Sequence, residues 1–322
     1  MDIEMEIEQR SLSVDRLARV LRLNQQRVRM VLDTDAFNEV DDQFAIAHLM
    51  VSPERVKLEA VYAAPFHNDR SDGPADGMER SYNEIFKVLD ALAIEPAPPV
   101  FRGATMWLDP AAPERSPAVL DLVARARAAS PEFPLHVVAL GAITNIAAAL
   151  LTAPEILENV VVTWIAGHIL EWSDAADFNL RQDIRAAQVV FDSGVPLALI
   201  PAMGVSSHMI CTVPELEEFL EPHSAIGSFL ARRFKAYRPG RMWSKEIWDV
   251  AAAAWLLDSN WISSQLIPRP IVTDQATWSF SRTRPLMLYV SMVDRDAIMS
   301  DVYTRLKSLG EQQRSTPAHI VA

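Results

Sequence analysis

The chain of 322 residues has few of several things that proteins use for common tasks. Its single cysteine, Cys211, rules out an internal disulfide and favours a reducing cytosol. Basic residues number 30 against 42 acidic ones, and a net charge of −12 argues against nucleic acid as a partner. No uninterrupted apolar run reaches the ~20 residues of a membrane span, and the acidic start Met1–Glu6 is unlike a secretory signal. We therefore expect a cytoplasmic protein, not bound to a membrane, that acts on a small molecule or a cation.

Half of the chain is hydrophobic, and from Val28 onward strand-like and helix-like segments alternate. Short apolar runs predict buried strands, and apolar side chains at a spacing of about 3.6 residues predict helices. We expect strands over 28–32, 56–64, 135–140, 160–165 and 197–201. We expect helices over 43–50, 81–92, from 144 and over 185–192, and loops over 69–77 and 107–116, where Gly, Pro or Asp are frequent. This rhythm favours an α/β fold with a mostly parallel, Rossmann-like sheet flanked by helices.

No break in composition marks a second domain, so we predict one domain over residues 28–311. Residues 1–27 are predicted to form an appended helix, because five apolar residues lie roughly on one face: Leu12, Val14, Leu17, Val20 and Leu21. Residues 312–322 are predicted to form a loose tail.

Five carboxylates lie close together at the end of the first expected strand: Asp33, Asp35, Glu39, Asp41 and Asp42. In open α/β sheets, ligands bind at the carboxyl ends of the strands. Mutually repelling charges in one turn are costly unless a cation or a polar ligand holds them. Asp35, Asp41 and Asp42 therefore predict a site for a hard divalent cation, although Asp41 and Asp42 also suit the positive end of a helix.

Three further segments carry acids and amides at the ends of expected elements. Asn68 follows the second strand, Asp177 and Asn179 are two residues apart, and Asp249 precedes an apolar helix. Each alone is typical of a cap or a turn. Together they supply groups that can hold the hydroxyls of a sugar, with carboxylates left over for a metal.

Four motifs, in this order, resemble the nucleoside hydrolase family, the inosine–uridine preferring nucleoside N-ribohydrolases. Asp33-Thr34-Asp35 with Asp41-Asp42 resembles the family's first signature, and Gly141-Ala142-Ile143-Thr144-Asn145-Ile146-Ala147 its second. Asp177-Phe178-Asn179 is similar to its Glu-Phe-Asn, and Trp248-Asp249 stands where members commonly have His-Asp. The matches run from about residue 30 to 300.

The resemblance implies a nucleoside hydrolase-like fold, usually a homodimer or homotetramer, that hydrolyses the N-glycosidic bond of ribonucleosides with calcium. By this resemblance Asp35, Asp42, the Leu140 carbonyl and Asp249 would ligate calcium, and Asp35 would also be the catalytic base. The ribose hydroxyls would be held by four residues: Asp41, Asn68, Asp177 and Asn179. The chemistry is consistent, because carboxylates stabilise an oxocarbenium-like sugar and a cation lowers the pKa of its bound water.

This sequence departs from the family in three places. The loop between Asp35 and Asp41 is two residues longer than usual, so we expect Asn38 and Glu39 to enter the site. Asp177 replaces the usual Glu and reaches less far by one methylene.

The third departure is Trp248, which replaces the histidine that protonates the leaving base in many members. Tryptophan cannot supply that proton but can stack on a purine, so we expect a purine preference, with Trp248, Trp172 or Trp243 as the stacking residue. His67 or His168 could take over as the acid.

Two other functions compete with this one. A phosphatase of the haloacid dehalogenase type also begins with a strand and Asp-x-Asp, but Ala36-Phe37 follows here where that class has Gly-Thr or Gly-Val, and no later lysine and acidic pair is convincing. A non-catalytic nucleoside or sugar binder on the same scaffold is the main alternative, because the loop is altered and the histidine is missing. Dependence of activity on calcium separates the enzyme from the binder.

Overall fold

The computed structural model describes residues 17, 21 and 27–315 of the chain. The helix predicted over residues 1–27 falls outside these residues except for Leu17 and Leu21, which are buried. Residues 316–322 of the predicted tail also lie outside them.

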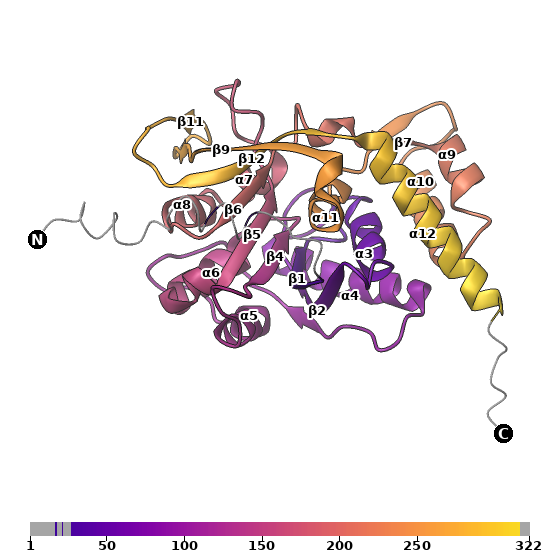
Figure 1. Cartoon of the computed structure of the whole chain (residues 1–322), viewed down its shortest axis with the longest axis horizontal. Coiled ribbons are helices and arrows are strands. Elements are labelled where there is room, and N and C mark those ends of the chain that lie inside the picture. The colour runs from indigo at the N-terminus through magenta and orange to yellow at the C-terminus, as the bar shows by residue number, and fades with distance from the viewer. Residues whose placement is uncertain (1–16, 18–20, 22–26, 316–322) are drawn as a thin grey trace, which may run out of the picture.

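An eight-stranded sheet forms the centre of the described part, with the strand order β3-β2-β1-β4-β5-β6-β12-β9 (Figure 1). Neighbouring strands are parallel except for β9, which pairs antiparallel with β12 at one edge. The strands of this sheet are β1 (Val28–Thr34), β2 (Val56–Ala63), β3 (Val100–Arg102), β4 (Leu135–Ala139), β5 (Val160–Ile165), β6 (Leu197–Ile200), β9 (Ile262–Pro268) and β12 (Leu286–Val293). The order 3-2-1-4-5-6 is that of the Rossmann arrangement, with its topological switch between β1 and β4.

Two two-stranded sheets stand apart from the large one. They pair β7 (Ile210–Thr212) with β8 (Ser244–Glu246), and β10 (Ile271–Val272) with β11 (Trp278–Ser279).

Helices cover both faces of the large sheet (Figure 1). The helices of the described part are α3 (Asp42–Met50), α4 (Pro74–Leu92), α5 (Pro117–Arg127), α6 (Thr144–Thr152), α7 (Phe178–Gln182), α8 (Ile184–Asp192), α9 (Val213–Phe219), α10 (Ala225–Tyr237), α11 (Val250–Leu257) and α12 (Arg295–Ser315), with 3-10 turns at Pro154–Asn159, Ser206–His208 and Ser259–Trp261. Successive residues of β1 alternate between two hydrophobic clusters: Met30 and Leu32 pack with α3, α4 and α11, and Val31 packs with α5 and α6. A strand buried on both faces is apolar throughout, which explains why the apolar runs mark these strands so clearly.

The predicted α/β fold with its parallel sheet and the predicted strands and helices are confirmed, and two boundaries are wrong. The segment 69–77 is only partly a loop, because α4 begins at Pro74 rather than near Ser81. Proline at the first helical position needs no hydrogen bond, so a residue that marks a loop in the sequence starts a helix here. Residues 312–315 are not tail but the last turn of α12.

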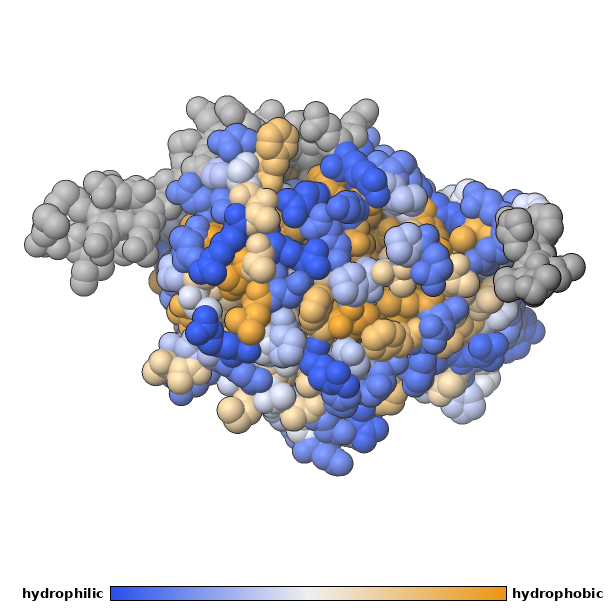
Figure 2. Space-filling view, turned by 90° about the horizontal axis from the view of Figure 1, so that it is seen from below, coloured by the Kyte–Doolittle hydropathy of each residue, from blue (hydrophilic) through white to orange (hydrophobic). Residues whose placement is uncertain are grey.

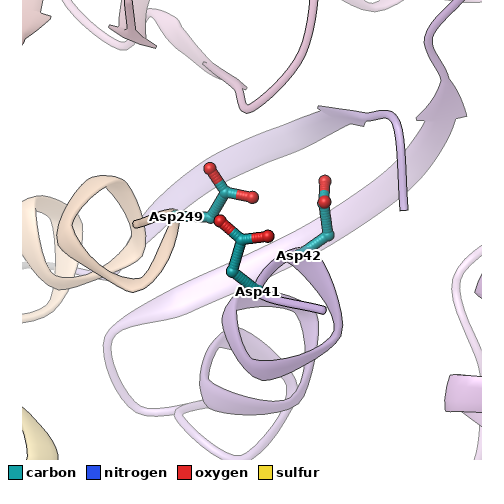
Figure 3. Close-up of side chains that lie close together, drawn as sticks. All are labelled: Asp41, Asp42 and Asp249. Carbon is teal, nitrogen blue, oxygen red and sulfur yellow. The ribbon is translucent and has the colours of Figure 1, made fainter. Parts of the chain in front are cut away.

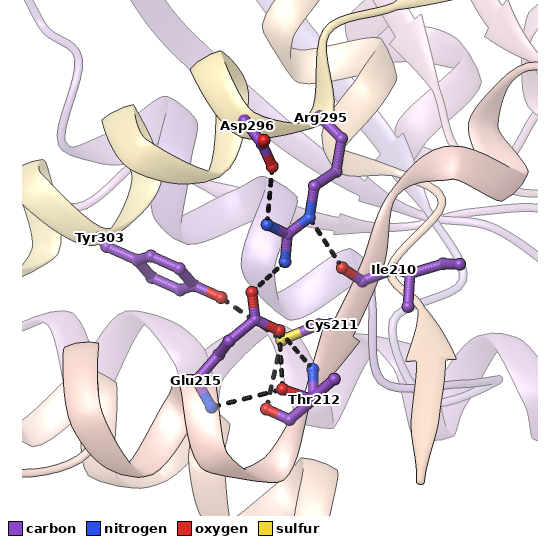
Figure 4. Close-up of polar contacts among 7 residues, drawn as sticks. All are labelled: Ile210, Cys211, Thr212, Glu215, Arg295, Asp296 and Tyr303. Carbon is purple, nitrogen blue, oxygen red and sulfur yellow. Dashed lines mark hydrogen bonds and ion pairs between the residues drawn. The ribbon is translucent and has the colours of Figure 1, made fainter.

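A polar network fixes α12 to the β7–α9 segment (Figure 4). Arg295 forms an ion pair with Glu215 and donates from Nε to the Ile210 carbonyl at 3.0 Å. The Cys211 sulfur lies 3.4 Å from the Tyr303 hydroxyl, and burial raises the pKa of Cys211 to about 12. This cysteine is therefore a buried structural residue, and the network holds β7 and its partner strand β8 in place.

On the face seen in Figure 2, hydrophilic residues are spread over the surface and hydrophobic ones show between them, mostly toward the middle. Some exposed apolar area of this kind is normal for a folded domain. Among the described residues, no helix is long and apolar enough to cross a membrane.

Candidate active site

The carboxyl ends of β1 and β4 border one cavity, at the topological switch of the sheet. Asp35 directly follows β1, Leu140 directly follows β4, and Leu140 N–H donates to the Asp33 carbonyl at 2.8 Å. The cavity measures about 650 Å³ with its open mouth included. Its lining consists of Asp35, Asn38, Glu39, Asp41, Asp42, Leu140, Ile165, His168, Asp177, Phe178, Asn179, Ala202, Met203, Trp248 and Asp249. This is the place where sheets of this topology bind ligands.

Three buried carboxylates of the cavity lining, Asp41, Asp42 and Asp249, lie close together (Figure 3). One oxygen from each lies within 4.8 Å of the other two. Asp41 and Asp249 sit at the N-cap positions of α3 and α11, yet neither side chain makes a capping hydrogen bond. The carboxylates are turned toward each other and not to the helix ends, so capping does not explain them.

Asp35 adds a fourth buried carboxylate beside Gly141. A Cβ on Gly141 would lie 2.9 Å from the Asp35 Cγ, so only glycine leaves room for this side chain. The Asp35 Oδ2 atom is buried and has no hydrogen-bond partner in the described part of the chain. An orphaned carboxylate oxygen next to three other acids indicates that a ligand completes the site.

Electrostatics point the same way. Burial, followed by repulsion from neighbouring acids, raises the pKa values of Asp35, Asp41 and Asp249 well above those of ordinary carboxyls. Burial also raises the pKa of Asp42, to about 6, although hydrogen bonds from Thr34 and Asp249 oppose it. Acids with such raised pKa values hold protons at neutral pH, and a cation can bind them in place of those protons.

The predicted metal ligands fit a hard cation, which prefers oxygen donors. Asp35, Asp42 and Asp249 all line the cavity, and so does Leu140. The Leu140 carbonyl accepts a hydrogen bond from Asn179 Nδ2 at 2.6 Å, which leaves it one further lone pair. The predicted donor set is three carboxylates and a carbonyl, and Glu39 of the longer loop also lines the cavity.

Three of the four residues predicted to hold a sugar make hydrogen bonds within the protein. Asn179 Nδ2 donates to the carbonyls of Leu140 at 2.6 Å and Ile165 at 3.0 Å. Asp177 lines the cavity, but its Oδ1 accepts from Gly167 N–H at 2.6 Å and Leu180 N–H at 3.0 Å. This caps α7, so Asp177 has less capacity for a ligand than the sequence indicates. Asn68 is not among the lining residues and donates instead to Asn38 Oδ1 at 2.7 Å.

Asp41 and Asn179 lie on the cavity wall as expected, and so do Asn38 and Glu39 from the longer loop.

Of the residues predicted to stack on the base or to donate a proton to it, some line the cavity and others do not. Trp248 lines the cavity, whereas Trp243 stacks on Phe234 with centroids 4.7 Å apart, and Trp172 lies edge-on to His168 at 5.6 Å. His168 lines the cavity and its buried Nδ1 has no hydrogen-bond partner among the described residues. His67 is exposed and is not among the lining residues.

Two further residues support the site, Asn145 of the second signature and Lys245, which the sequence did not indicate. Asn145 donates from Nδ2 to Asp33 Oδ2 at 2.7 Å, so the Thr-Asn motif fixes the end of β1 from behind. Lys245 on β8 forms an ion pair with Glu39. No spacing marks Lys245 beforehand, because it lies 206 residues from its partner.

The fold and site define an α/β protein with an acidic ligand site at the switch point of a parallel sheet. The family model described as inosine-uridine preferring nucleoside hydrolase matches residues 30–304, so the chain belongs to that family.

Curated relatives include the pyrimidine-specific ribonucleoside hydrolase RihA of Klebsiella pneumoniae, 32% identical over 155 residues. This match covers 45% of the chain and 49% of the relative, so the chain spans about half the length of such relatives. The RihA of Salmonella paratyphi A is 26% identical over 259 residues, 71% of the chain and 79% of the relative.

Solved structures with the same fold include the purine-preferring ribonucleoside hydrolase from Gardnerella vaginalis, with a TM-score of 0.67 and 21% identity. It is matched over 88% of this chain and 99% of its own. The plant nucleoside hydrolase PpNRh1 aligns with a TM-score of 0.70 and 18% identity, over 87% and 99%. The predicted family and fold are therefore confirmed.

Proposed function

We propose that this protein is an N-glycosyl hydrolase that splits ribonucleosides into base and ribose and requires a divalent cation, for which calcium is our expectation. The observation that carries the proposal is the convergence of Asp41, Asp42 and Asp249 beside the orphaned Asp35, at the ligand-binding edge of the sheet. Four acids buried so close together repel one another, and such a cost is typical of functional sites.

Asp35 is the proposed base. Asp35 lines the cavity, and its buried Oδ2 has no hydrogen-bond partner among the described residues, so this oxygen is available to accept a proton. A divalent cation bound here would lower the pKa of a water ligand and neutralise the acids. Asp41 and Asn179 on the wall are proposed to bind the glycone hydroxyls, and the carboxylates around the sugar to favour an oxocarbenium-like transition state.

The leaving base needs a stacking surface and a proton. Trp248 is half-buried on the cavity wall, with Met203 also in the lining, and we propose that it stacks on a purine. His168 is the proposed proton donor, because it is the histidine among the lining residues and its ring lies beside Trp172. The similar proteins include both pyrimidine-specific and purine-preferring hydrolases, so base preference is a matter for experiment.

Non-catalytic binding on the same scaffold is the second candidate. It is favoured by Asp177, whose carboxylate is largely occupied by backbone amides, and by the hydrogen bond that Asn179 makes to the Leu140 carbonyl. Assembly into homodimers or homotetramers and a cytoplasmic location also stay predictions.

The test is hydrolysis of p-nitrophenyl β-D-ribofuranoside by the purified protein with calcium and after chelation with EGTA. This leaving group departs without an acid, so the replacement of histidine by Trp248 does not affect the result. We expect release of nitrophenolate that stops on chelation and returns with calcium. No release from protein with calorimetrically demonstrated calcium binding would refute the enzyme and support the binder.

A further inference from the structure

The longer loop between β1 and α3 places a fifth carboxylate, Glu39, at the edge of the acidic cavity. Its Oε2 is paired with the Lys245 ammonium, while Oε1 has no hydrogen bond to any described residue. The Glu39 side chain is 33% exposed and that of Lys245 only 9%. One carboxylate oxygen therefore anchors the side chain, and the other is free to meet a ligand.

Lys245 holds this carboxylate from a fixed position. Its strand β8 pairs with β7, where Lys245 lies opposite Cys211 in the network of Figure 4. Burial by itself would lower the pKa of Lys245, but the charges of Asp41 and Glu39 raise it above the usual value. The ion pair with this buried ammonium orients the Glu39 carboxylate with respect to the cavity.

A series of contacts connects the loop that carries Asn38 and Glu39 to the Asn68–Arg70 segment and to Tyr237 of α10. Asn38, the neighbour of Glu39, accepts from Asn68 Nδ2 at 2.7 Å, and Asn68 Oδ1 accepts from Arg70 N–H at 2.9 Å. The Arg70 guanidinium lies 5.3 Å from the centre of the Tyr237 ring, and Lys245 Nζ lies 4.9 Å from the same centre. Cation–π contacts of this kind hold both side chains against one aromatic ring. Lys245 in turn pairs with Glu39.

We infer that Glu39, held in place by Lys245, recognises a hydroxyl of the glycone and so determines specificity for a hydroxyl-rich sugar such as ribose. The inference rests on the proposed function only in that a glycone enters this cavity. Glu39 offers a free acceptor oxygen, and Asp41 and Asn38 line the same cavity. A hydrogen bond from a hydroxyl to an ionised carboxylate is stronger than one between two neutral groups. Lys245 is a positioning residue, since it acts through Glu39.

The experiment measures D-ribose binding to the calcium-loaded protein by calorimetry, with KM and kcat for p-nitrophenyl β-D-ribofuranoside beside it. Loss of a charged hydrogen bond weakens affinity by about 10-fold or more, so Glu39→Ala should raise the ribose dissociation constant and the KM by that factor, with kcat changed less than about threefold. Glu39→Gln keeps an acceptor for Lys245 and serves if the alanine variant fails to fold. Exposed Glu132→Gln is the matched control.

Lys245 is tested through its coupling to Glu39. Lys245→Met should weaken ribose binding, as the Glu39 variants do, and Lys245→Arg should keep it close to the wild type. The double variant Lys245→Met, Glu39→Gln should bind ribose no more weakly than the weaker-binding single variant. Exposed Lys307→Met is the control for loss of a lysine charge.

Calcium affinity decides between a sugar contact and a metal ligand. Unchanged calcium binding in Glu39→Gln, with weaker ribose binding, supports the inference. A tenfold loss of calcium affinity with ribose binding intact would overturn it, as would ribose binding equal to the wild type or no ribose binding by the wild type. Ribose binding without hydrolysis would refute the proposed function and leave the inference standing.

Discussion

Replacing Asp249 with asparagine should make the calcium-free protein more stable and abolish its response to calcium. Asp249 is buried in a group of acids whose oxygens lie within 4.8 Å of one another. Two unit charges at that distance repel by about 3.5 kcal/mol at an effective dielectric constant of 20. Protons taken up by the acids relieve part of this, so we expect a gain of about 1–3 kcal/mol in the free energy of unfolding without calcium.

The same substitution removes a ligand for the cation. At a calcium concentration 100 times the dissociation constant, binding stabilises the wild type by about 2.7 kcal/mol. The entropy of unfolding scales to roughly 0.7 kcal/mol/K for a chain of 322 residues, so calcium should raise the Tm by about 4 °C. If Asp249→Asn weakens binding about 100-fold, the same concentration gives about 0.4 kcal/mol and a shift below about 1 °C.

Differential scanning calorimetry with calcium and with EGTA measures both the stability without calcium and the shift in Tm that calcium causes. Asp90→Asn on the exposed face of α4 is the control, and its calcium shift should equal that of the wild type. A Tm of Asp249→Asn below the wild type in EGTA would contradict the argument from repulsion. A calcium shift as large as that of the wild type would remove Asp249 from the metal site.

Four further substitutions test the remaining parts of the argument. Asp35→Asn should lower turnover of p-nitrophenyl β-D-ribofuranoside by about 10²–10⁴-fold while circular dichroism is unchanged, and near-normal turnover would exclude it as the base. His168→Gln should lower kcat for inosine about 100-fold but change kcat for the p-nitrophenyl riboside less than threefold. Trp248→Ala should raise KM for inosine more than KM for that activated riboside. Equal effects on both substrates would argue against His168 as the acid or Trp248 as the stacking residue, respectively. Burial lowers the pKa of His136 to about 4; because the unfolded chain binds its proton from about pH 6.5 downward, the wild type should lose about 2 kcal/mol between pH 7 and 5 that His136→Leu retains in urea titrations, and parallel losses in both proteins would refute this.

The fold was largely predictable because its information is local. Strands buried on both faces are mostly apolar, so Val160–Ile165 and the Met30–Leu32 part of β1 stand out in the sequence. The first acid motif is equally local, since Asp35, Asp41 and Asp42 lie within eight residues of one another. Adjacent acids at the end of a strand predict a cation or a polar ligand from their mutual repulsion alone.

What depends on packing between distant segments was not predictable. The start of α4 at Pro74 was missed, because proline and glycine mark loops and helix ends alike. The pattern that singled out Asp177 could not tell a sugar ligand from a helix cap, a matter decided by where Gly167 N–H lies.

The sequence by itself determined the alternation of strands and helices and the local acids of the site, because hydrophobic period and charge repulsion act between near neighbours. The folded structure was needed to show that His168 and not His67 lines the cavity, that Asn68 bonds to Asn38 instead, and that Lys245 pairs with Glu39. These residues come from segments far apart in the chain. Their meeting depends on strand order and helix packing, which no local spacing encodes.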